Sequence, residues 1–276
     1  MTSELLDLAT AIALEAGELA ARRRREGVEV ADTKSTVVDV VTEPDREVER
    51  LIRDRLADAR PADGFLGEEG GAADSTSGVT WVVDPIDGTT NYLYGIPHYA
   101  VSIAAVEGDG DERTWGDIVG VVFNPASGEL FSGQAGKGAW RTAAGSTTAI
   151  RVADPVPFEQ LLVATGFAYA SEMRGIQGAI ATRLLPRIRD IRRAGTASLD
   201  LSFVACGRYN AYYERTLSRW DFAAGAIIAR EAGAVVKGRG ENAPGRDFII
   251  AGHPDVVAPL EAELILYGVA EPPVER

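Results

Sequence analysis

The sequence predicts a mixed α/β protein in which helices cover β-sheets, and two observations support this fold class. Over residues 1–150, two amphipathic helical patterns precede apolar, β-branched runs separated by turn residues, which is typical of an antiparallel meander with helices on one side. Over residues 151–276, strands and helices alternate at short intervals. Because no repeat or long linker separates these halves, we expect one domain over residues 1–276.

The composition limits the partners and the location of the protein. A formal net charge of −13 disfavours nucleic acid and acidic membrane surfaces as partners. No uncharged apolar run reaches the ~20 residues needed to cross a bilayer. The first residues include Glu4 and Asp7 instead of the basic segment of a signal peptide. We therefore expect a cytoplasmic protein.

The scarcity of cysteine and histidine limits the chemistry. With Cys206 alone, no disulfide can form within the chain, which fits a reducing compartment. A zinc site of the Cys/His type lacks ligands, and a Ser–His–Asp triad would need His98 or His253. We interpret both histidines as structural, because neither has a nucleophile nearby in sequence. Catalysis, if present, is expected to use carboxylates, hydroxyls and hard cations.

The first half begins with two helices. Apolar residues recur at three- and four-residue steps over residues 3–25, and Arg22–Arg25 complement the dipole at the end of this helix, although they could also form an anion patch. A second helix starts after Thr42, a good N-cap, and runs past Leu56. Asp45 stands at its third position, where a carboxylate closes a capping box. Asp45 alone therefore indicates little about function.

Acidic residues follow two apolar strands. Glu68 and Glu69 lie among glycines after a short strand at residues 65–66, although a solvated loop would have a similar sequence. Residues 72–78 are small and polar, and we expect them to form a mobile loop. The run Trp81–Val83 predicts a buried strand that ends in a turn with Asp84 and Asp87. Gly88 allows close approach of a ligand, and hard oxygens beside N–H groups suit a phosphate ester held by Mg²⁺. A capped strand-to-helix turn is the alternative.

Further strands and helices are predicted along the rest of the chain. In the first half, strands are expected at Tyr99–Val106, Trp115–Phe123, through Phe131 and near Trp140, with a turn at Gly108–Asp111. In the second half, strands are expected at Leu161–Thr165, Ile188–Arg192, Tyr209–Tyr213, Ala234–Lys237 and Phe248–Ala251. Helices are expected up to about Leu185, from Gly195 to Gly207, over Phe222–Ala232 and from Pro254.

Two glycine-rich segments imitate phosphate-binding loops. Gly133–Gly138 lacks the first glycine and the final Ser/Thr of a Walker loop. Gly238–Ala243 resembles a dinucleotide fingerprint, but Pro244 and Asp247 follow it where a helix is required. We exclude both as nucleotide sites of these types.

Four stretches in order resemble the inositol monophosphatase family of Mg²⁺-dependent, lithium-sensitive phosphatases, relatives of fructose-1,6-bisphosphatase. These stretches are Lys34…Asp39–x–x–Thr42–x–x–Asp45, Gly67–Glu68–Glu69, Asp84–Pro–Ile–Asp87–Gly–Thr–Thr–Asn91 and Trp220–Asp221–x–Ala–Ala–Gly225. The resemblance covers nearly the whole chain and implies a layered αβαβα sandwich of the sugar phosphatase type. It also implies a homodimer and hydrolysis of a phosphate monoester by a metal-activated water.

The resemblance implies roles for individual residues. Two or three Mg²⁺ ions would be bound by Glu68, Asp84, the carbonyl of Ile86, Asp87 and Asp221. Asp45 and Thr89, with Glu68, would orient and deprotonate the attacking water. The phosphate would be held by the N–H groups of Gly88 and Thr89, and the alcohol half would face Asp87, Gly195, Thr196, Ala197, Glu214 and Asp221. For Asp221 alone, an N-cap at the start of a helix is the alternative.

The substrate is the least constrained part of the prediction. Arg219, Tyr94 and Ala168 depart from residues common in the family, and all three flank the expected pocket. Myo-inositol 1-phosphate is the first expectation, because the Glu214 carboxylate can accept hydrogen bonds from vicinal hydroxyls but repels a second phosphate. Histidinol phosphate, fructose 1,6-bisphosphate and 3′-phosphoadenosine 5′-phosphate stay open, as does a non-catalytic regulatory protein with the same fold.

Overall fold

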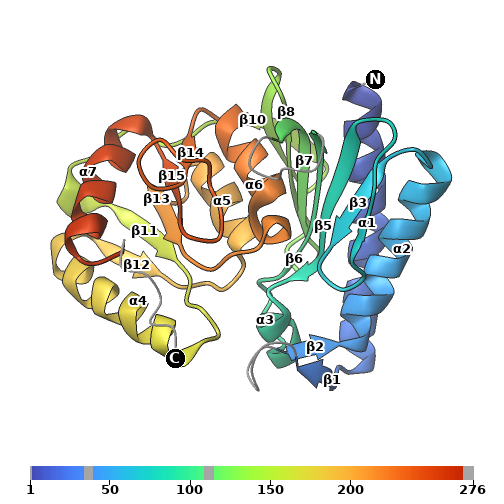
Figure 1. The fold of residues 1–276 in the computed structure, drawn as a ribbon, viewed down its shortest axis with the longest axis horizontal. Coiled ribbons are helices and arrows are strands. Elements are labelled where there is room, and N and C mark those ends of the chain that lie inside the picture. The colour runs from blue at the N-terminus through green and yellow to red at the C-terminus, as the bar shows by residue number, and fades with distance from the viewer. Residues whose placement is uncertain (1, 34–39, 109–114, 270–276) are drawn as a thin grey trace.

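The protein is built in five layers of alternating helices and sheets (Figure 1). The structure, a computed structural model, describes residues 2–33, 40–108 and 115–269. From one side to the other, a helix pair, an eight-stranded sheet, a second helix pair, a five-stranded sheet and a third helix pair follow one another. The three pairs are α1 (Thr2–Glu26) with α2 (Glu43–Ala59), α5 (Ala197–Ala205) with α6 (Arg219–Glu231), and α4 (Ser171–Leu184) with α7 (Pro254–Leu266). The predicted layered αβαβα sandwich is confirmed.

The larger sheet has the strand order β10-β9-β8-β7-β6-β5-β3-β4. Its strands are β3 (Gly64–Gly67), β4 (Ala72–Ala73), β5 (Val79–Asp87), β6 (Ala100–Glu107), β7 (Gly116–Asn124), β8 (Glu129–Gln134), β9 (Gly138–Ala143) and β10 (Ser146–Ile150). Neighbours are antiparallel except β3 and β5, which are parallel. A short helix, α3 (Thr89–Tyr94), follows β5, and β1 (Val30–Thr33) pairs separately with β2 (Val40–Thr42).

The smaller sheet has the strand order β12-β11-β13-β15-β14. Its strands are β11 (Leu162–Thr165), β12 (Asp190–Arg192), β13 (Ala211–Glu214), β14 (Val235–Lys237) and β15 (Ile249–Gly252). Strand β11 is parallel to both of its neighbours, and β15 is antiparallel to both of its own. Two short 3₁₀ helices, Phe158–Gln160 and Leu185–Arg187, lie in the connections.

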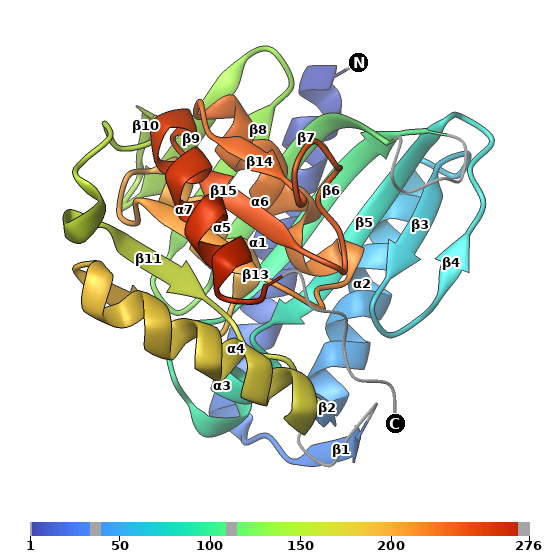
Figure 2. The same ribbon diagram turned by 60° about the vertical axis from the view of Figure 1, so that its left-hand side comes forward.

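The middle helix layer joins the two sheets. Residues Phe222–Ala229 of α6 are all buried, because this helix packs on β6, β7 and β8 as well as on the smaller sheet. A Cβ on Gly120 of β7 would lie 2.5 Å from the carbonyl oxygen of Ala224, so only glycine permits this approach of helix and sheet. In the rotated view of Figure 2, α5 and α6 lie behind the strands of the smaller sheet.

Most predicted elements agree with the structure, although the short pair of strands β1 and β2 was not predicted. The helices of residues 1–150, α1 and α2, lie on one side of the first sheet as expected, and α6 from the second half covers the opposite face. Strand β10 was not predicted, and Ala72–Ala73 forms a two-residue strand within the segment expected to be a loop. The predicted turn at Gly108–Asp111 falls largely outside the described residues, as do Lys34 and Asp39 of the first motif.

The Walker-like segment has a structural role. The N–H groups of Gly136, Lys137 and Gly138, in the turn between β8 and β9, donate to the carboxylate of Glu231 at 2.8–3.1 Å. This loop therefore binds an acidic side chain of α6 from the same chain, and the exclusion of a nucleotide site there is supported.

Candidate active site

The end of β5 brings two acidic side chains into the interior. Asp84 and Asp87 are both buried, and the register between β5 and β6 shifts between these two residues. The strand thus continues through Asp87 with a bulge, where the sequence predicted a turn, and a bulge redirects side chains in this way. The N–H of Ile86 donates to Oδ1 of Asp84 at 3.1 Å, which fixes the first carboxylate.

Gly88 allows the two halves of the chain to meet at the site. Its φ of +93° is left-handed, and a Cβ there would lie 2.4 Å from Oγ1 of Thr196. Helix α3 starts at the next residue, Thr89. Thr196 is buried, and its hydroxyl donates to the carbonyl of His98 at 2.9 Å, so this side chain supports the site.

The start of α5 binds the Asp87 carboxylate. Oδ2 of Asp87 accepts hydrogen bonds from the N–H of Ser198 at 2.7 Å and from its hydroxyl at 2.5 Å, and the N–H of Ala197 donates to the same carboxylate. A helix N-terminus favours negative charge, so this arrangement stabilises the ionised form. The sequence predicted a helix opening at Gly195–Ser198 but gave Ser198 no role, and a serine at such an opening is a signal that could have found it.

Asp45 and Thr89 lie in contact, as the resemblance implies. The Thr89 hydroxyl is 3.2 Å from Oδ1 of Asp45 and 3.1 Å from the carbonyl oxygen of Ile86. The other Asp45 oxygen accepts from the N–H of Thr42 at 2.9 Å and from the Thr42 hydroxyl, which completes a capping box. Asp45 is fully buried, and the predicted capping box and the contact with Thr89 occur together.

A buried glutamate that the sequence did not single out holds the Glu68 loop. Glu49 of α2 accepts from the N–H of Glu69 at 2.7 Å, and a Cβ on Gly67 or Gly70 would lie 2.5 Å or 2.3 Å from its carboxylate oxygens. Arg53, one turn further along α2, contacts the same carboxylate at 3.4 Å and stacks on the ring of Phe65. The pattern of glycines around Glu68 was the available signal, because it reserves space for this side chain.

Asp221 enters the site from the first turn of α6. The N-cap of this helix is Ser218, and Asp221 is the third helical residue, so the alternative that Asp221 is an N-cap is wrong. The N–H of Ser218 donates to Oδ2 of Asp221 at 2.6 Å. The other oxygen is left for a further partner, since a carboxylate can accept at both oxygens.

The acidic side chains act on one another electrostatically. Burial, with a contribution from the charge of Glu68, raises the pKa of Asp45 to about 7. Burial also raises the pKa of Asp87, and that of Asp221 well above its usual range, with the Glu68 charge again raising both. Glu68 therefore lies near all three, and the site concentrates negative charge from α2, the β3–β4 loop, β5 and α6.

Glu214 lies on the second-half side of this cluster. The hydroxyl of Tyr212 donates to its Oε2 at 2.6 Å, and the space it occupies exists because residue 166 is glycine, whose Cβ would lie 2.0 Å from the carboxylate. Burial raises the pKa of Glu214 to about 7, and the charge of Asp87 contributes. The structure thus brings Glu214 toward the carboxylates of β5, as the resemblance implies.

The acidic side chains of the site supply oxygen donors of the kind that divalent metals prefer. Within the described part of the chain, no group of three or more His, Cys, Asp and Glu side chains already has the geometry to hold a metal ion. Asp87 and Asp221 instead direct oxygens at Ser198 and Ser218. The donors are nevertheless hard oxygens whose mutual repulsion a divalent cation relieves, so the residues fit Mg²⁺ in kind. Binding would replace some of these internal hydrogen bonds.

The two histidines take structural positions. The carbonyl of His98 accepts from Asn91 and Thr196, and its ring contacts Phe203 edge-on. His253 caps α7 by accepting from the N–H of Asp255 at 3.2 Å. Both interactions support the interpretation that histidine has no catalytic part here.

Comparison with known proteins defines the class and then the family. A protein from Mycobacterium leprae named inositol-1-monophosphatase is 42% identical over 277 residues, covering 95% of this chain and 93% of its own length. The solved structure of Mycobacterium tuberculosis SuhB has a TM-score of 0.82 and 38% identity, covering 98% and 99% of the two chains. A Xylella fastidiosa protein named Nus factor SuhB is 38% identical over 240 residues, covering 84% and 83%.

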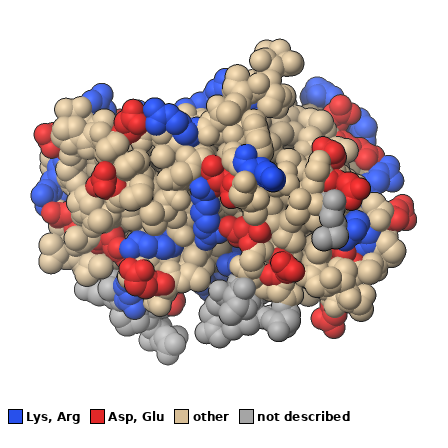
Figure 3. Space-filling model, turned by 90° about the horizontal axis from the view of Figure 1, so that it is seen from above, with Lys and Arg blue, Asp and Glu red and all other residues tan. Residues whose placement is uncertain are grey.

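The fold, the carboxylate cluster and these relatives define a phosphatase that acts on phosphate monoesters. The model of the inositol monophosphatase family matches residues 1–266, and the chain belongs to that family. No helix among the described residues is long and apolar enough to cross a bilayer. On the face seen in Figure 3, acidic and basic side chains are interspersed, without a broad basic surface.

Proposed function

We propose that this protein hydrolyses myo-inositol 1-phosphate to myo-inositol and inorganic phosphate in an Mg²⁺-dependent reaction. The main support is the gathering of Asp45, Glu68, Asp87 and Asp221 from four separate elements, seen in the effect of the Glu68 charge on the other three. Such a concentration of acids, with Asp45 and Asp87 buried, destabilises the fold unless it serves a ligand. A cationic ligand followed by an anionic substrate fits this charge.

Glu68, Asp84, the carbonyl of Ile86, Asp87 and Asp221 would hold two or three Mg²⁺ ions. When bound, Mg²⁺ supplies positive charge that stabilises the entering and leaving oxygens of a displacement at phosphorus. Asp221 would use the oxygen that does not accept from Ser218, whereas Asp87 would exchange hydrogen bonds from the start of α5 for the ions. Glu49 keeps the loop of Glu68 in place through the N–H of Glu69.

Thr89 and Asp45 would orient the attacking water. A Thr hydroxyl that donates to Asp45 or to the Ile86 carbonyl has lone pairs left to accept a proton from water. Asp45 is fixed by Thr42 and has a pKa of about 7, so it can receive a proton near neutral pH. The two side chains thus form a short route for the proton that the water loses.

The substrate would lie between the start of α3 and the start of α5. The N–H groups of Gly88 and Thr89 would donate to phosphate oxygens, because the left-handed Gly88 brings the backbone close to the site. Glu214, Asp87 and the backbone of residues 195–197 would face the alcohol. The carboxylate of Glu214 suits vicinal hydroxyls, which favours a polyol over histidinol phosphate, fructose 1,6-bisphosphate or 3′-phosphoadenosine 5′-phosphate.

The proposal is tested by phosphate release from these four compounds, each with Mg²⁺ and with EDTA. We expect Mg²⁺-dependent release that is fastest from myo-inositol 1-phosphate. Glu214→Gln should lower kcat/KM for that substrate and change release from the others less. Equal release from all four compounds, or an unchanged polyol preference in Glu214→Gln, would contradict the substrate assignment.

A non-catalytic regulatory function is the second candidate. It is favoured by the 38% identity to the Xylella fastidiosa protein whose name, Nus factor SuhB, describes no phosphatase. Folded protein that binds Mg²⁺ and releases phosphate from none of the four compounds would support this candidate. Homodimer assembly and lithium sensitivity are further proposals that rest on family membership alone, and a cytoplasmic location is a proposal that rests on the composition of the chain.

A further inference from the structure

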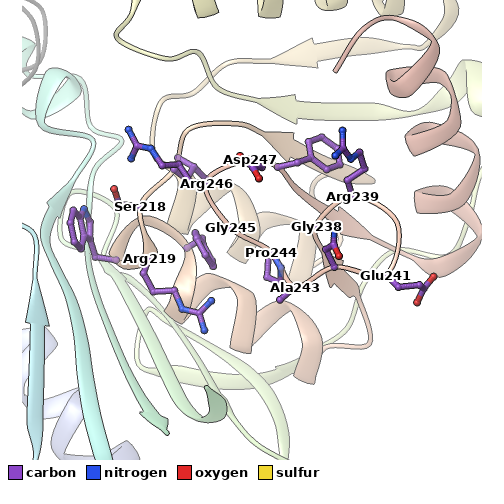
Figure 4. A pocket seen from close by; sticks show the side chains of 15 residues that line it. Ser218, Arg219, Gly238, Arg239, Glu241, Ala243, Pro244, Gly245, Arg246 and Asp247 are labelled. Atoms are coloured by element: carbon purple, nitrogen blue, oxygen red, sulfur yellow. The ribbon is translucent and has the colours of Figure 1, made fainter. Parts of the chain in front are cut away.

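A cavity of about 850 Å³ between the first turn of α6 and the connection from β14 to β15 is separate from the proposed alcohol site (Figure 4). None of the residues proposed to face the alcohol, all of which the structure describes, lines this cavity. Selection of the alcohol half of a substrate therefore depends on the surroundings of Glu214, outside the cavity.

The segment of residues 166–170, which follows β11, forms the surface on which the Glu214 carboxylate packs. Strand β11 is parallel to β13, with Thr165 opposite Tyr213, so the residues that come next, Gly166 and Glu214, are neighbours. A Cβ on Gly166 would lie 2.0 Å from Oε2 and 2.1 Å from Oε1 of Glu214. The carboxylate therefore rests directly on the backbone of Gly166, and a displacement of the segment would change the space in which Glu214 lies.

The same segment is in contact with the start of α5 through Arg193. The guanidinium carbon of Arg193 lies 5.9 Å from the centroid of the Phe167 ring. A Cβ on Gly195 would lie 2.3 Å from Nη1 of Arg193, so the guanidinium also lies against Gly195. Burial raises the pKa of Glu214, and the positive charge of Arg193 acts against this rise, so Arg193 is close to that carboxylate as well. Residues 166 and 167 thus adjoin both groups, Glu214 and Gly195, that are proposed to face the alcohol.

Two side chains of α4 hold this segment by its backbone. The carboxamide oxygen of Gln177 accepts from the N–H of Ala168 at 2.8 Å. Arg174 donates from Nε to the carbonyl of Ala168 at 3.1 Å and from Nη2 to the carbonyl of Tyr169 at 3.0 Å. Side chains three residues apart lie on the same face of a helix, so Arg174 and Gln177 bind neighbouring backbone groups together.

Stability alone does not explain a glutamine at position 177. Gln177 is buried, and its Nε2 has no hydrogen-bond partner among the residues that the structure describes. Burying an amide N–H group without a partner costs free energy, which the bond to Ala168 offsets only in part. An apolar side chain would avoid this cost but would leave the buried Ala168 without its acceptor. The hydrogen bond to the segment is therefore what the glutamine supplies.

We propose that Arg174 and Gln177 are positioning residues that set the selectivity of the site for its alcohol by fixing residues 166–170 against Glu214. This inference rests on the proposed function, because it assigns the alcohol half of the substrate to Glu214. The phosphate half is proposed to be held by the N–H groups of Gly88 and Thr89, which belong to the first half of the chain. Loss of the α4 contacts should therefore weaken binding of the alcohol and leave binding of the phosphate unchanged.

The test compares two substrates at saturating Mg²⁺. Myo-inositol 1-phosphate offers vicinal hydroxyls to Glu214, whereas p-nitrophenyl phosphate offers none. We expect Arg174→Ala and Gln177→Leu each to raise the KM for myo-inositol 1-phosphate about tenfold, with a smaller change in kcat, and to leave the KM for p-nitrophenyl phosphate unchanged. Arg183→Ala, which removes the same charge from an exposed position of α4, should have wild-type constants for both substrates.

A second measurement requires no activity. In EDTA, the N–H of Ala168 should exchange its hydrogen slowly in the wild type and in Arg183→Ala, because it is buried and bonded to Gln177. Exchange at Ala168 should be about tenfold faster in Gln177→Leu, which removes the acceptor, and in Arg174→Ala, which releases the adjacent carbonyls.

Three results would overturn the inference. Equal KM values of Arg174→Ala and Arg183→Ala for myo-inositol 1-phosphate would show that the contacts do not affect the alcohol. A fall in kcat by the same factor for both substrates would show that Arg174 and Gln177 only support the fold. Unchanged exchange at Ala168 in Gln177→Leu would show that α4 does not hold the segment.

Failure of the proposed function would give a different result. A wild type that hydrolyses neither substrate, with faster exchange at Ala168 in Gln177→Leu and Arg174→Ala, would refute the proposed function and the role in selectivity. The same exchange result would still establish that α4 fixes residues 166–170.

Discussion

Replacing Glu214 by glutamine isolates the electrostatic cost of one buried acid in the site. The Glu214 side chain is almost fully buried, and its Oε2 accepts from the hydroxyl of Tyr212 at 2.6 Å. Glutamine has nearly the same shape and keeps an oxygen to accept that hydrogen bond. The change therefore removes an ionisable group and little else, so a change in the free energy of unfolding can be assigned to the loss of that ionisation.

The sign and size of the effect follow from the pKa. Burial raises the pKa of Glu214 from its ordinary 4.5 to about 7. Between pH 4.5 and pH 7 the folded protein retains a proton on Glu214 that the unfolded chain has released. The free energy of unfolding is therefore highest below pH 4.5 and falls as the pH rises through the folded pKa of about 7. A difference of about 2.5 pH units corresponds to about 3 kcal/mol in the free energy of unfolding. Glu214→Gln lacks this loss.

The assay is urea unfolding in EDTA at pH 5, 6, 7 and 8. We expect the free energies of unfolding of wild type and Glu214→Gln to be similar at pH 5 and to diverge by about 3 kcal/mol at pH 8, with the variant more stable. Glu129→Gln is the control of opposite sign, because Arg208 holds the pKa of Glu129 below its ordinary value. That variant should lose stability at neutral pH and lose less as pH falls. Parallel curves for wild type and Glu214→Gln would refute the reasoning.

Two further substitutions test the supports of the site. Glu49→Ala should destabilise the fold by about 2 kcal/mol and raise the Mg²⁺ concentration for half-maximal activity about tenfold, because Glu49 holds the Glu68 loop. Glu47→Ala, on the exposed side of the same helix, should leave the Mg²⁺ dependence unchanged. Equal shifts of the Mg²⁺ dependence in the two variants would contradict a positioning role for Glu49. Gly88→Ala should lower the free energy of unfolding by about 3 kcal/mol, because the left-handed φ is combined with a clash on Thr196. Gly128→Ala, at a φ of +71° with no neighbour within 4 Å, should lower it by about 1 kcal/mol. Equal urea midpoints for the two variants would show that the clash is absent.

The local pattern of the sequence was sufficient for most elements. Helix α2 illustrates this, since Thr42, Pro44 and Asp45 specify its start through backbone capping, which depends on neighbouring residues alone. Strand β10 escaped prediction because its residues 146–149 are exposed and small or polar, so they show no apolar period. The position of α6 on the first sheet also escaped, because contacts between distant parts of the chain leave no local period.

The candidate site was predicted where its residues lie in distinctive motifs, and missed where they support those motifs from a distance. Asp87 stands in a recognisable run, but its partner Ser198 lies 111 residues further along the chain. Glu49 appears as one of several acids on an amphipathic helix, and only the fold reveals that it is buried against the Glu68 loop. Spacing along the chain cannot reveal such pairs, because they depend on how elements pack.

The central claim is that the buried carboxylates serve Mg²⁺-dependent hydrolysis of a phosphate monoester. The most direct measurement is phosphate release from myo-inositol 1-phosphate as a function of Mg²⁺ for wild type, Asp87→Asn and Asp58→Asn, the last removing the same charge from the exposed surface of α2. We predict Mg²⁺-dependent release by wild type and Asp58→Asn, and release no greater than in EDTA for folded Asp87→Asn. Release by Asp87→Asn that equals the wild type, or release by wild type that persists in EDTA, would contradict the claim.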